Sequence, residues 1–122
     1  MSNTFGIPEE VEQKIRHRDK VCVYCHKTMI YPCVGINQCD WATIEHFREE
    51  GPFYWWDGLK EEDLAICCKS CNSSRRRNKL LDWFQKPYCT DPKRNINEKT
   101  VAEPVKEYIR KNERYMDATK KR

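Results

Sequence analysis

Between positions 42 and 79 the chain reads ATIEHFREEGPFYWWDGLKEEDLAICCKSCNSSRRRNK. Two short runs in it, 42–46 and 64–67, are rich in residues that favour strands and predict two strands. A C-x2-C pair follows the second run. An Asn and several basic residues then lead into a helical apolar pattern over 72–86, which Pro87 is expected to end. This order of two strands, a cysteine pair and a helix decides the fold.

A second C-x2-C pair lies upstream of this stretch, 42 residues before the first. Two cysteines at this spacing can reach one tetrahedral ion from a tight turn, so two pairs predict one structural zinc ion. The four expected ligands are Cys22, Cys25, Cys68 and Cys71. Redox pairs are the alternative, but a thioredoxin-like motif needs a βαβ pattern that the sequence lacks. The other four cysteines lack the spacing and are expected to be free thiols: Cys33, Cys39, Cys67 and Cys89.

The composition fits one small soluble domain. The chain has 122 residues, of which 39% are hydrophobic and 34% are charged. It shows no apolar run long enough to span a membrane and no signal-peptide pattern. We therefore expect a cytoplasmic protein with reduced thiols and no membrane partner.

Charge of opposite sign gathers in different parts of the chain. Residues 27–63 carry three basic and eight acidic side chains, whereas residues 69–86 carry six basic and one acidic. Residues 87–122 carry ten basic and six acidic. The C-terminal half would therefore attract an anion such as nucleic acid. Taken alone, this pattern describes a solvated basic surface equally well.

The flanking segments predict a domain over residues 1–86, with its core at 20–86, and a basic helical extension over 87–122. A helix is expected from about Pro8 to Asp19, because a proline and acidic residues open it. Residues 27–41 read as an irregular hairpin or long loop. Of the four consecutive aromatics at 53–56, at least two are expected to plug the core. A last, highly charged helix is expected from Val101 or Ala102 to about Lys120.

A second metal site follows from Asn72, the residue after the last of the four expected zinc ligands. Successive helical residues point about 100° apart, so Asn72 turns away from the zinc that Cys71 faces. The strand ending at Glu45-His46 is the natural neighbour. A carboxylate, an imidazole and a carboxamide oxygen would then surround one point, which suits a hard divalent ion such as Mg or Mn. Adjacent strand residues face opposite sides, so Glu45 and His46 can share a site only if the chain leaves the strand there. The alternative is a solvated carboxylate and a structural histidine.

With these pieces, the chain resembles an HNH endonuclease of the ββα-metal class. The resemblance rests on RHRDKVCVYC, ATIEHF and DLAICCKSCNSSRRRNK and covers about Pro8 to Lys86. It implies an α+β domain with a ββα-metal core that hydrolyses DNA phosphodiester bonds and nicks one strand per site. The metal ligands would be Glu45 and Asn72, and His46 would be the general base. The DNA phosphates would be bound by four basic residues: Arg75, Arg76, Arg77 and Lys79.

Two positions depart from the family pattern. Glu45 stands where Asp is more common, which moves the carboxylate by a methylene. Asp63 stands where the middle Asn of the motif is usual. We expect Asp63 to hold the loop and orient His46, although an ionised carboxylate accepts hydrogen bonds and cannot donate them.

The same cysteine frame, basic helix and aromatic loop would serve a non-catalytic zinc module that binds nucleic acid. Such a module has no need of His46 together with Asn72. A protein-interaction zinc module is a third possibility, but it leaves the Arg75–Arg77 run unexplained. Whether the chain acts as a monomer or a dimer stays open.

Overall fold

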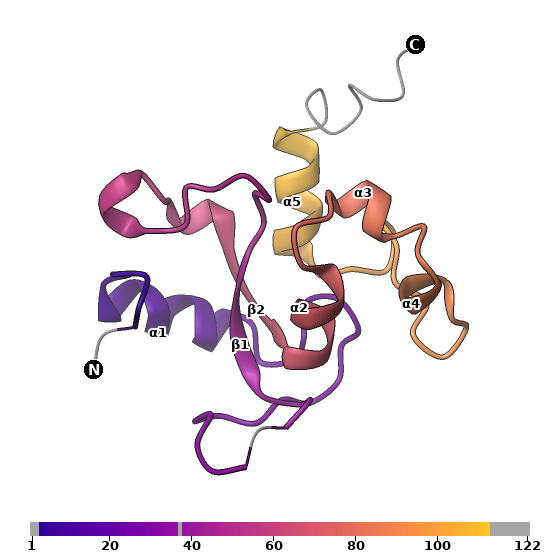
Figure 1. Cartoon of the computed structure of the whole chain (residues 1–122), viewed down its shortest axis with the longest axis horizontal. Helices are drawn as coiled ribbons and strands as arrows, with labels where there is room; N and C mark the ends of the chain where they lie inside the picture. Colours follow the sequence, from indigo (N-terminus) through magenta and orange to yellow (C-terminus); the bar gives the residue numbers. More distant parts are fainter. Residues whose placement is uncertain (1–2, 37, 113–122) are drawn as a thin grey trace.

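The computed structural model describes residues 3–36 and 38–112. Its two strands, β1 (Ala42–His46) and β2 (Leu64–Cys68), pair antiparallel, with Glu45 opposite Ala65 and His46 opposite Leu64. The described part is a small α+β domain, as the sequence predicts (Figure 1). Its elements in chain order are α1 (Glu9–Arg18), β1 (Ala42–His46), η1 (Trp55–Asp57), η2 (Glu61–Asp63), β2 (Leu64–Cys68), α2 (Lys69–Arg75), α3 (Leu80–Trp83), α4 (Pro87–Thr90) and α5 (Glu103–Lys111).

Helix α1 forms where the sequence predicts a helix. Acidic residues occupy its first turn and basic residues its last, which complements the helix dipole at both ends. The carboxylate of Asp19, just after the helix, accepts a hydrogen bond of 3.0 Å from the backbone N–H of Ile66. Arg16 donates to the backbone oxygen of Ala42 at 2.8 Å. These two contacts fasten α1 across both strands.

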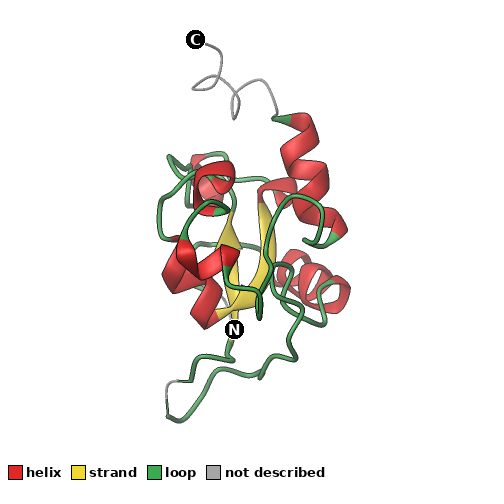
Figure 2. Cartoon of the chain, turned by 90° about the vertical axis from the view of Figure 1, so that its right-hand side faces the viewer, coloured by secondary structure: helices red, strands yellow, loops and turns green. Residues whose placement is uncertain are grey.

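The two strands separate two hydrophobic cores. On one side Leu64 and Ile66 pack with Ile7 and Ile15, and α1 covers this side. On the other side Ala65 and Cys67 belong to a core that includes Trp83 of α3. Every residue of β2 is buried, because both of its faces are covered. Figures 1 and 2 show the strands between α1 on one side and the later helices on the other.

The single helix predicted over 72–86 is wrong: the structure has two short helices there, α2 and α3. Helix α2 ends at Arg75, and Arg76 has a φ of 52°, which a right-handed helix does not allow. Side chains hold this reversal, because Arg75 donates to the backbone oxygen of Asn78 and the Asn78 amide donates back to that of Arg75. Pro87 begins α4 instead of ending a helix.

The described part of the C-terminal extension packs back on the domain. Cys89, Ile96 and Val105 follow the predicted domain boundary at Lys86, yet they share a hydrophobic core with Trp83, which precedes it. Helix α5 ends at Lys111, and the remainder of the predicted helix, residues 113–122, lies outside the described residues. Across residues 3–36 and 38–112, no helix combines the length and apolar character needed to span a membrane.

Candidate functional site: a cysteine cluster beside a polar cavity

The four cysteines of the two C-x2-C pairs come together. Their sulfur atoms all lie within 4.8 Å of one another, and Cys25 Sγ lies 3.8 Å from Cys68 Sγ. A zinc–sulfur bond of about 2.3 Å in a tetrahedron gives sulfur–sulfur edges of about 3.8 Å, so the cluster has the size that a tetrahedral ion needs. The eight cysteines all lie in the described part of the chain, and none forms a disulfide. The cluster can hold a metal ion.

Backbone N–H groups already point at two of these sulfurs. Cys22 Sγ accepts from the N–H groups of Tyr24 and Cys25 at 3.4 and 3.5 Å, and Cys68 Sγ accepts from the N–H of Cys71 at 3.4 Å. Hydrogen bonds from the neighbouring thiols, Cys22 first, hold the pKa of Cys25 well below its ordinary value. Hydrogen bonds with Cys22 and Cys25 raise the pKa of Cys68 and Cys71 in turn, so the four thiols share protons. Within the cluster Cys25 is the cysteine that most favours thiolate, the form that binds metal.

A cavity of about 230 Å³ lies beside the end of β1. Three of its lining residues are those expected to form the second metal site: Glu45, His46 and Asn72. Because His46 is the last residue of β1, the chain leaves the strand at the point where the two neighbours would otherwise diverge. The rest of its lining is Arg48, Glu49, Phe53, Arg76 and Arg77.

Asn72 is oriented by β1. Its amide nitrogen donates to Thr43 Oγ1 at 3.0 Å and to the backbone oxygen of Ile44 at 3.1 Å. Both N–H donors are thereby used on the strand, which leaves the carboxamide oxygen as the group that can bind a cation. The expectation that Asn72 faces the strand is confirmed.

His46 is half-buried between two phenylalanine rings. Its ring centroid lies 4.3 Å from that of Phe5 and 5.8 Å from that of Phe53. Nε2 lies 3.2 Å from the backbone oxygen of Phe53, an acceptor, so Nε2 carries the proton and Nδ1 has the free lone pair. Burial lowers the pKa of His46 below its ordinary value, although the Glu45 carboxylate acts to raise it. The imidazole is therefore neutral at pH 7 and can accept a proton.

Glu45 is buried in an ion pair. Its Oε2 lies 2.7 Å from Arg75 Nη1 and also accepts a hydrogen bond from the Tyr24 hydroxyl. Burial alone would lower the pKa of Arg75, but the adjacent carboxylate raises it, so the pair stays charged. Burial, with Glu45 beside it, raises the pKa of Tyr24 well above its ordinary value, which keeps the hydroxyl a donor.

The expectation that Arg75 binds phosphate is wrong for this structure. The side chain is 1% exposed, and its guanidinium also donates to the backbone oxygens of His46 and Phe47, at 3.0 and 2.5 Å. Its donors are used inside the protein, so none is presented to a ligand. Arg76 and Arg77 are exposed and line the cavity, whereas half-buried Lys79 precedes α3 and lies outside the cavity lining. Nucleic-acid binding by these three residues stays a prediction.

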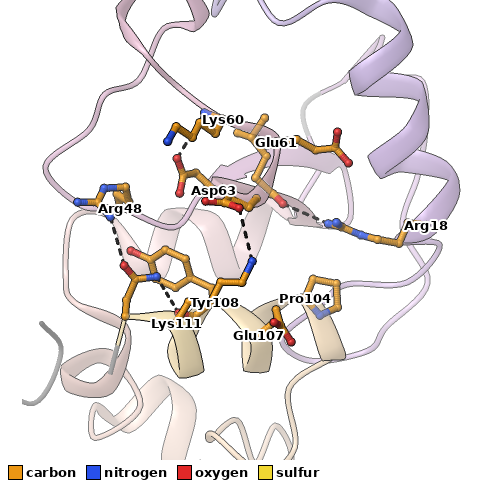
Figure 3. A pocket seen from close by; sticks show the side chains of 12 residues that line it. Arg18, Arg48, Lys60, Glu61, Asp63, Pro104, Glu107, Tyr108 and Lys111 are labelled. Atoms are coloured by element: carbon orange, nitrogen blue, oxygen red, sulfur yellow. Dashed lines mark hydrogen bonds and ion pairs between the residues drawn. The ribbon is translucent and has the colours of Figure 1, made fainter. Parts of the chain in front are cut away.

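Asp63 does not orient His46. Its carboxylate accepts from the backbone N–H of Lys60 at 3.4 Å and so holds the turn before β2. It lines a different, larger cavity of about 560 Å³, which Figure 3 shows between η2 and α5 with Tyr108 and Lys111 on the α5 side. His46 Nε2 donates instead to the backbone oxygen of Phe53, so among the described residues no contact supports the expected catalytic role of Asp63. Only its part in holding the loop is confirmed.

Three residues of the site were missed by the sequence analysis. Tyr24 holds Glu45, and its place between two cysteines of one pair was a usable signal. Glu49 lines the cavity with its Oε1 4.0 Å from Arg75 Nη2, so a second carboxylate offsets the arginine charge. Arg48 lines both cavities and donates to the Asn112 side chain at 3.4 Å. No local pattern distinguishes Arg48 and Glu49 from other charged loop residues.

Comparison with protein-family models, with curated proteins and with solved structures finds no match to this chain.

Proposed function

We propose that this chain is a metal-dependent DNA endonuclease of the HNH type, with a ββα-metal core and one structural zinc ion on its cysteine cluster. The observation that carries the proposal is the cavity that brings Glu45, His46 and Asn72 together. Strand β1 supplies Glu45 and His46, and α2, which directly follows β2, supplies Asn72, in the order that the family resemblance implies. Four thiolates would complete the coordination of zinc and leave it no open position, so catalysis belongs to the cavity.

Glu45 and Asn72 offer the oxygen ligands that suit Mg or Mn, which would supply positive charge against the phosphate. His46 accepts a proton from water at Nδ1, and the water oxygen attacks phosphorus. The bond to the leaving 3′ oxygen breaks, and that oxygen takes up a proton, so the products are a 5′-phosphate and a 3′-hydroxyl. Arg76 and Arg77 bind the backbone phosphates.

One site of this kind cuts one strand, so the expected product is a nick. The direct test incubates supercoiled plasmid with the zinc-loaded protein and Mg or Mn, and follows the relaxed form. His46→Ala should lower the nicking rate about 10²- to 10⁴-fold, the usual contribution of a positioned base. The matched control is His17→Ala, because His17 is an exposed histidine on α1 outside the cavity. Equal loss in both variants, or nicking by His46→Ala at the parent rate, contradicts the assignment.

One observation favours a second candidate, a non-catalytic zinc module that binds nucleic acid. The Glu45 carboxylate already pairs with Arg75, so its charge is partly neutralised without a divalent ion. Glu49 lies beside Arg75 as a second carboxylate, so Glu45, Arg75 and Glu49 together carry a net charge of −1. This local excess of carboxylate favours the nuclease. Plasmid that binds the protein but stays supercoiled in both Mg and Mn would decide for the non-catalytic module.

A further inference from the structure

The loop that leads from β1 to β2 presents two aromatic rings to solvent. Tyr54 is 41% exposed and Trp56 is 68% exposed. Their rings stack, with centroids 4.9 Å apart and planes 13° from parallel. Of the four consecutive aromatics, at least two of which are predicted to lie in the core, Trp55 packs against the core and Phe53 is half-buried beside His46. Tyr54 and Trp56 need another explanation.

The stacked pair is held in place by the N-terminal segment. The Trp56 ring lies against Gly6, where a Cβ would collide with it, and Gly6 has a φ of +73°, which favours glycine. The backbone N–H of Trp55 donates to the oxygen of Phe5 at 2.8 Å. A pair fixed in this way loses little conformational freedom when a ligand stacks on it, which favours binding.

Aromatic contacts continue from this pair to the proposed catalytic cavity. The Tyr54 ring centroid lies 6.4 Å from that of Phe5, which packs edge-on against His46. His46 in turn contacts Phe53, over whose ring the Arg77 guanidinium carbon lies 5.0 Å from the centroid. We call this row the aromatic strip: Trp56, Tyr54, Phe5, His46 and Phe53. It joins the exposed pair to the cavity and to its arginines.

Charge along the strip distinguishes its two ends. Arg76 and Arg77 stand at the cavity end, where a phosphate would bind, whereas the exposed Asp57 follows Trp56 at the other end. An acidic neighbour disfavours a phosphate there but does not disfavour the neutral face of a base. The strip is therefore complementary to a strand whose phosphate lies at the arginines and whose base lies on the rings.

We propose that the aromatic strip binds unpaired nucleobases, so that the site prefers single-stranded or locally unpaired DNA; this rests on the proposed function of the cavity. A base inside a duplex has both faces covered by its neighbours and cannot stack on Trp56. An unpaired base can, and base–aromatic stacking tolerates any sequence.

Binding without cleavage tests the proposal. Fluorescence anisotropy is measured on the zinc-loaded protein without Mg or Mn, with labelled DNA of about 16 nucleotides, the upper end of common site sizes. The three probes are a single strand, the matching duplex and a duplex with a central unpaired bubble. The parent protein should bind the single strand and the bubble more tightly than the duplex. Trp56→Ala should weaken those two about 5- to 150-fold and leave duplex binding unchanged.

Two further variants and one control separate stacking from other causes. Trp56→Phe should keep most of the affinity, whereas Trp56→Leu, which is apolar but has no π face, should lose it as Trp56→Ala does. Tyr31→Ala is the matched control, because Tyr31 is 53% exposed and lies outside the strip. Zinc content and circular dichroism check that each variant folds.

The outcomes also separate this inference from the proposed nuclease. Single-strand affinity that is equal in Trp56→Ala and the parent overturns the aromatic strip, even if the plasmid is nicked. Equal loss on the single strand and the duplex also overturns it, since that result indicates a backbone contact. If Trp56→Ala loses single-strand binding but the parent never nicks plasmid, the strip stands and the nuclease proposal fails.

Discussion

Arg75 provides the sharpest test of the site, because sequence and structure assign it different roles. The proposed change is Arg75→Ala. The structure shows a guanidinium that donates to Glu45, to the backbone oxygens of the last residue of β1 and the residue after it, and to the backbone oxygen of Asn78. Truncation would leave Glu45, itself 3% exposed, as a buried carboxylate that still accepts a hydrogen bond from the Tyr24 hydroxyl but has lost its cation.

The expected cost is large. Removing one partner of a buried, hydrogen-bonded ion pair typically destabilises a protein by about 3–5 kcal/mol. Typical domains have a stability of only about 5–15 kcal/mol, so the loss is a sizeable part of the total. With a urea m-value of about 1.5 kcal/mol/M, it would lower the unfolding midpoint by about 2–3 M. Because the guanidinium does not reach solvent, the salt dependence of DNA binding by the folded variant should match that of the parent.

The assay is urea unfolding of zinc-loaded protein, followed by tryptophan fluorescence, with a double-mutant cycle. Glu45→Gln combined with Arg75→Met removes both charges and should cost less than the two single changes added together. The exposed neighbour provides a control: Arg77→Ala should change the midpoint little. If Arg75→Ala unfolds like the parent while its salt slope falls by about one, the guanidinium binds phosphate and the structural role is refuted.

Three other changes have clear expected results. Cys68→Ser should leave three thiolates and lower zinc affinity, so the variant should bind substoichiometric zinc and unfold or aggregate; a folded variant that is free of zinc contradicts the cluster's structural role. Arg76→Gly should raise stability by about 1 kcal/mol, because Arg76 occupies a left-handed φ of 52°. Arg76→Gly and Arg76→Ala should weaken DNA binding equally, whereas only the glycine variant should unfold at higher urea. Nicking should rise with pH through a midpoint below 6.5, since burial lowers the pKa of His46 and the neutral imidazole is the base; a midpoint above 7 would exclude that assignment.

Much of the site could be predicted from local patterns. The two runs of strand-forming residues, the two C-x2-C pairs and the position of Asn72 one residue after Cys71 are all local in the chain, and the structure has them as expected. The direction of the Arg75 side chain could be predicted too, because Asn72 and Arg75 are three residues apart and share a helix face. Treating the three arginines as one basic run hid that Arg75 turns towards β1 while its neighbours turn to solvent.

Other features depend on contacts between distant parts of the chain. The helix break at Arg76 is stabilised by the reciprocal hydrogen bonds between Arg75 and Asn78 and by the burial of Arg75 against β1. Helix propensities of the residues do not predict this break. His46 donates its hydrogen bond to a backbone oxygen of the aromatic loop, an acceptor that any residue at position 53 would provide. No motif residue marks it, so Asp63 was chosen in its place.

The cysteine cluster and the polar cavity are linked through two neighbours in sequence. Tyr24 precedes Cys25 and holds Glu45, whereas Asn72 follows Cys71 and donates to β1. Each side of the cluster therefore carries one side chain to the strand that bears the proposed ligand and base. A metal on the four thiols would fix both neighbours without touching the cavity. The cluster is thus expected to set the orientation of Glu45 and Asn72, so its loss should disorder the cavity even where the two strands stay paired.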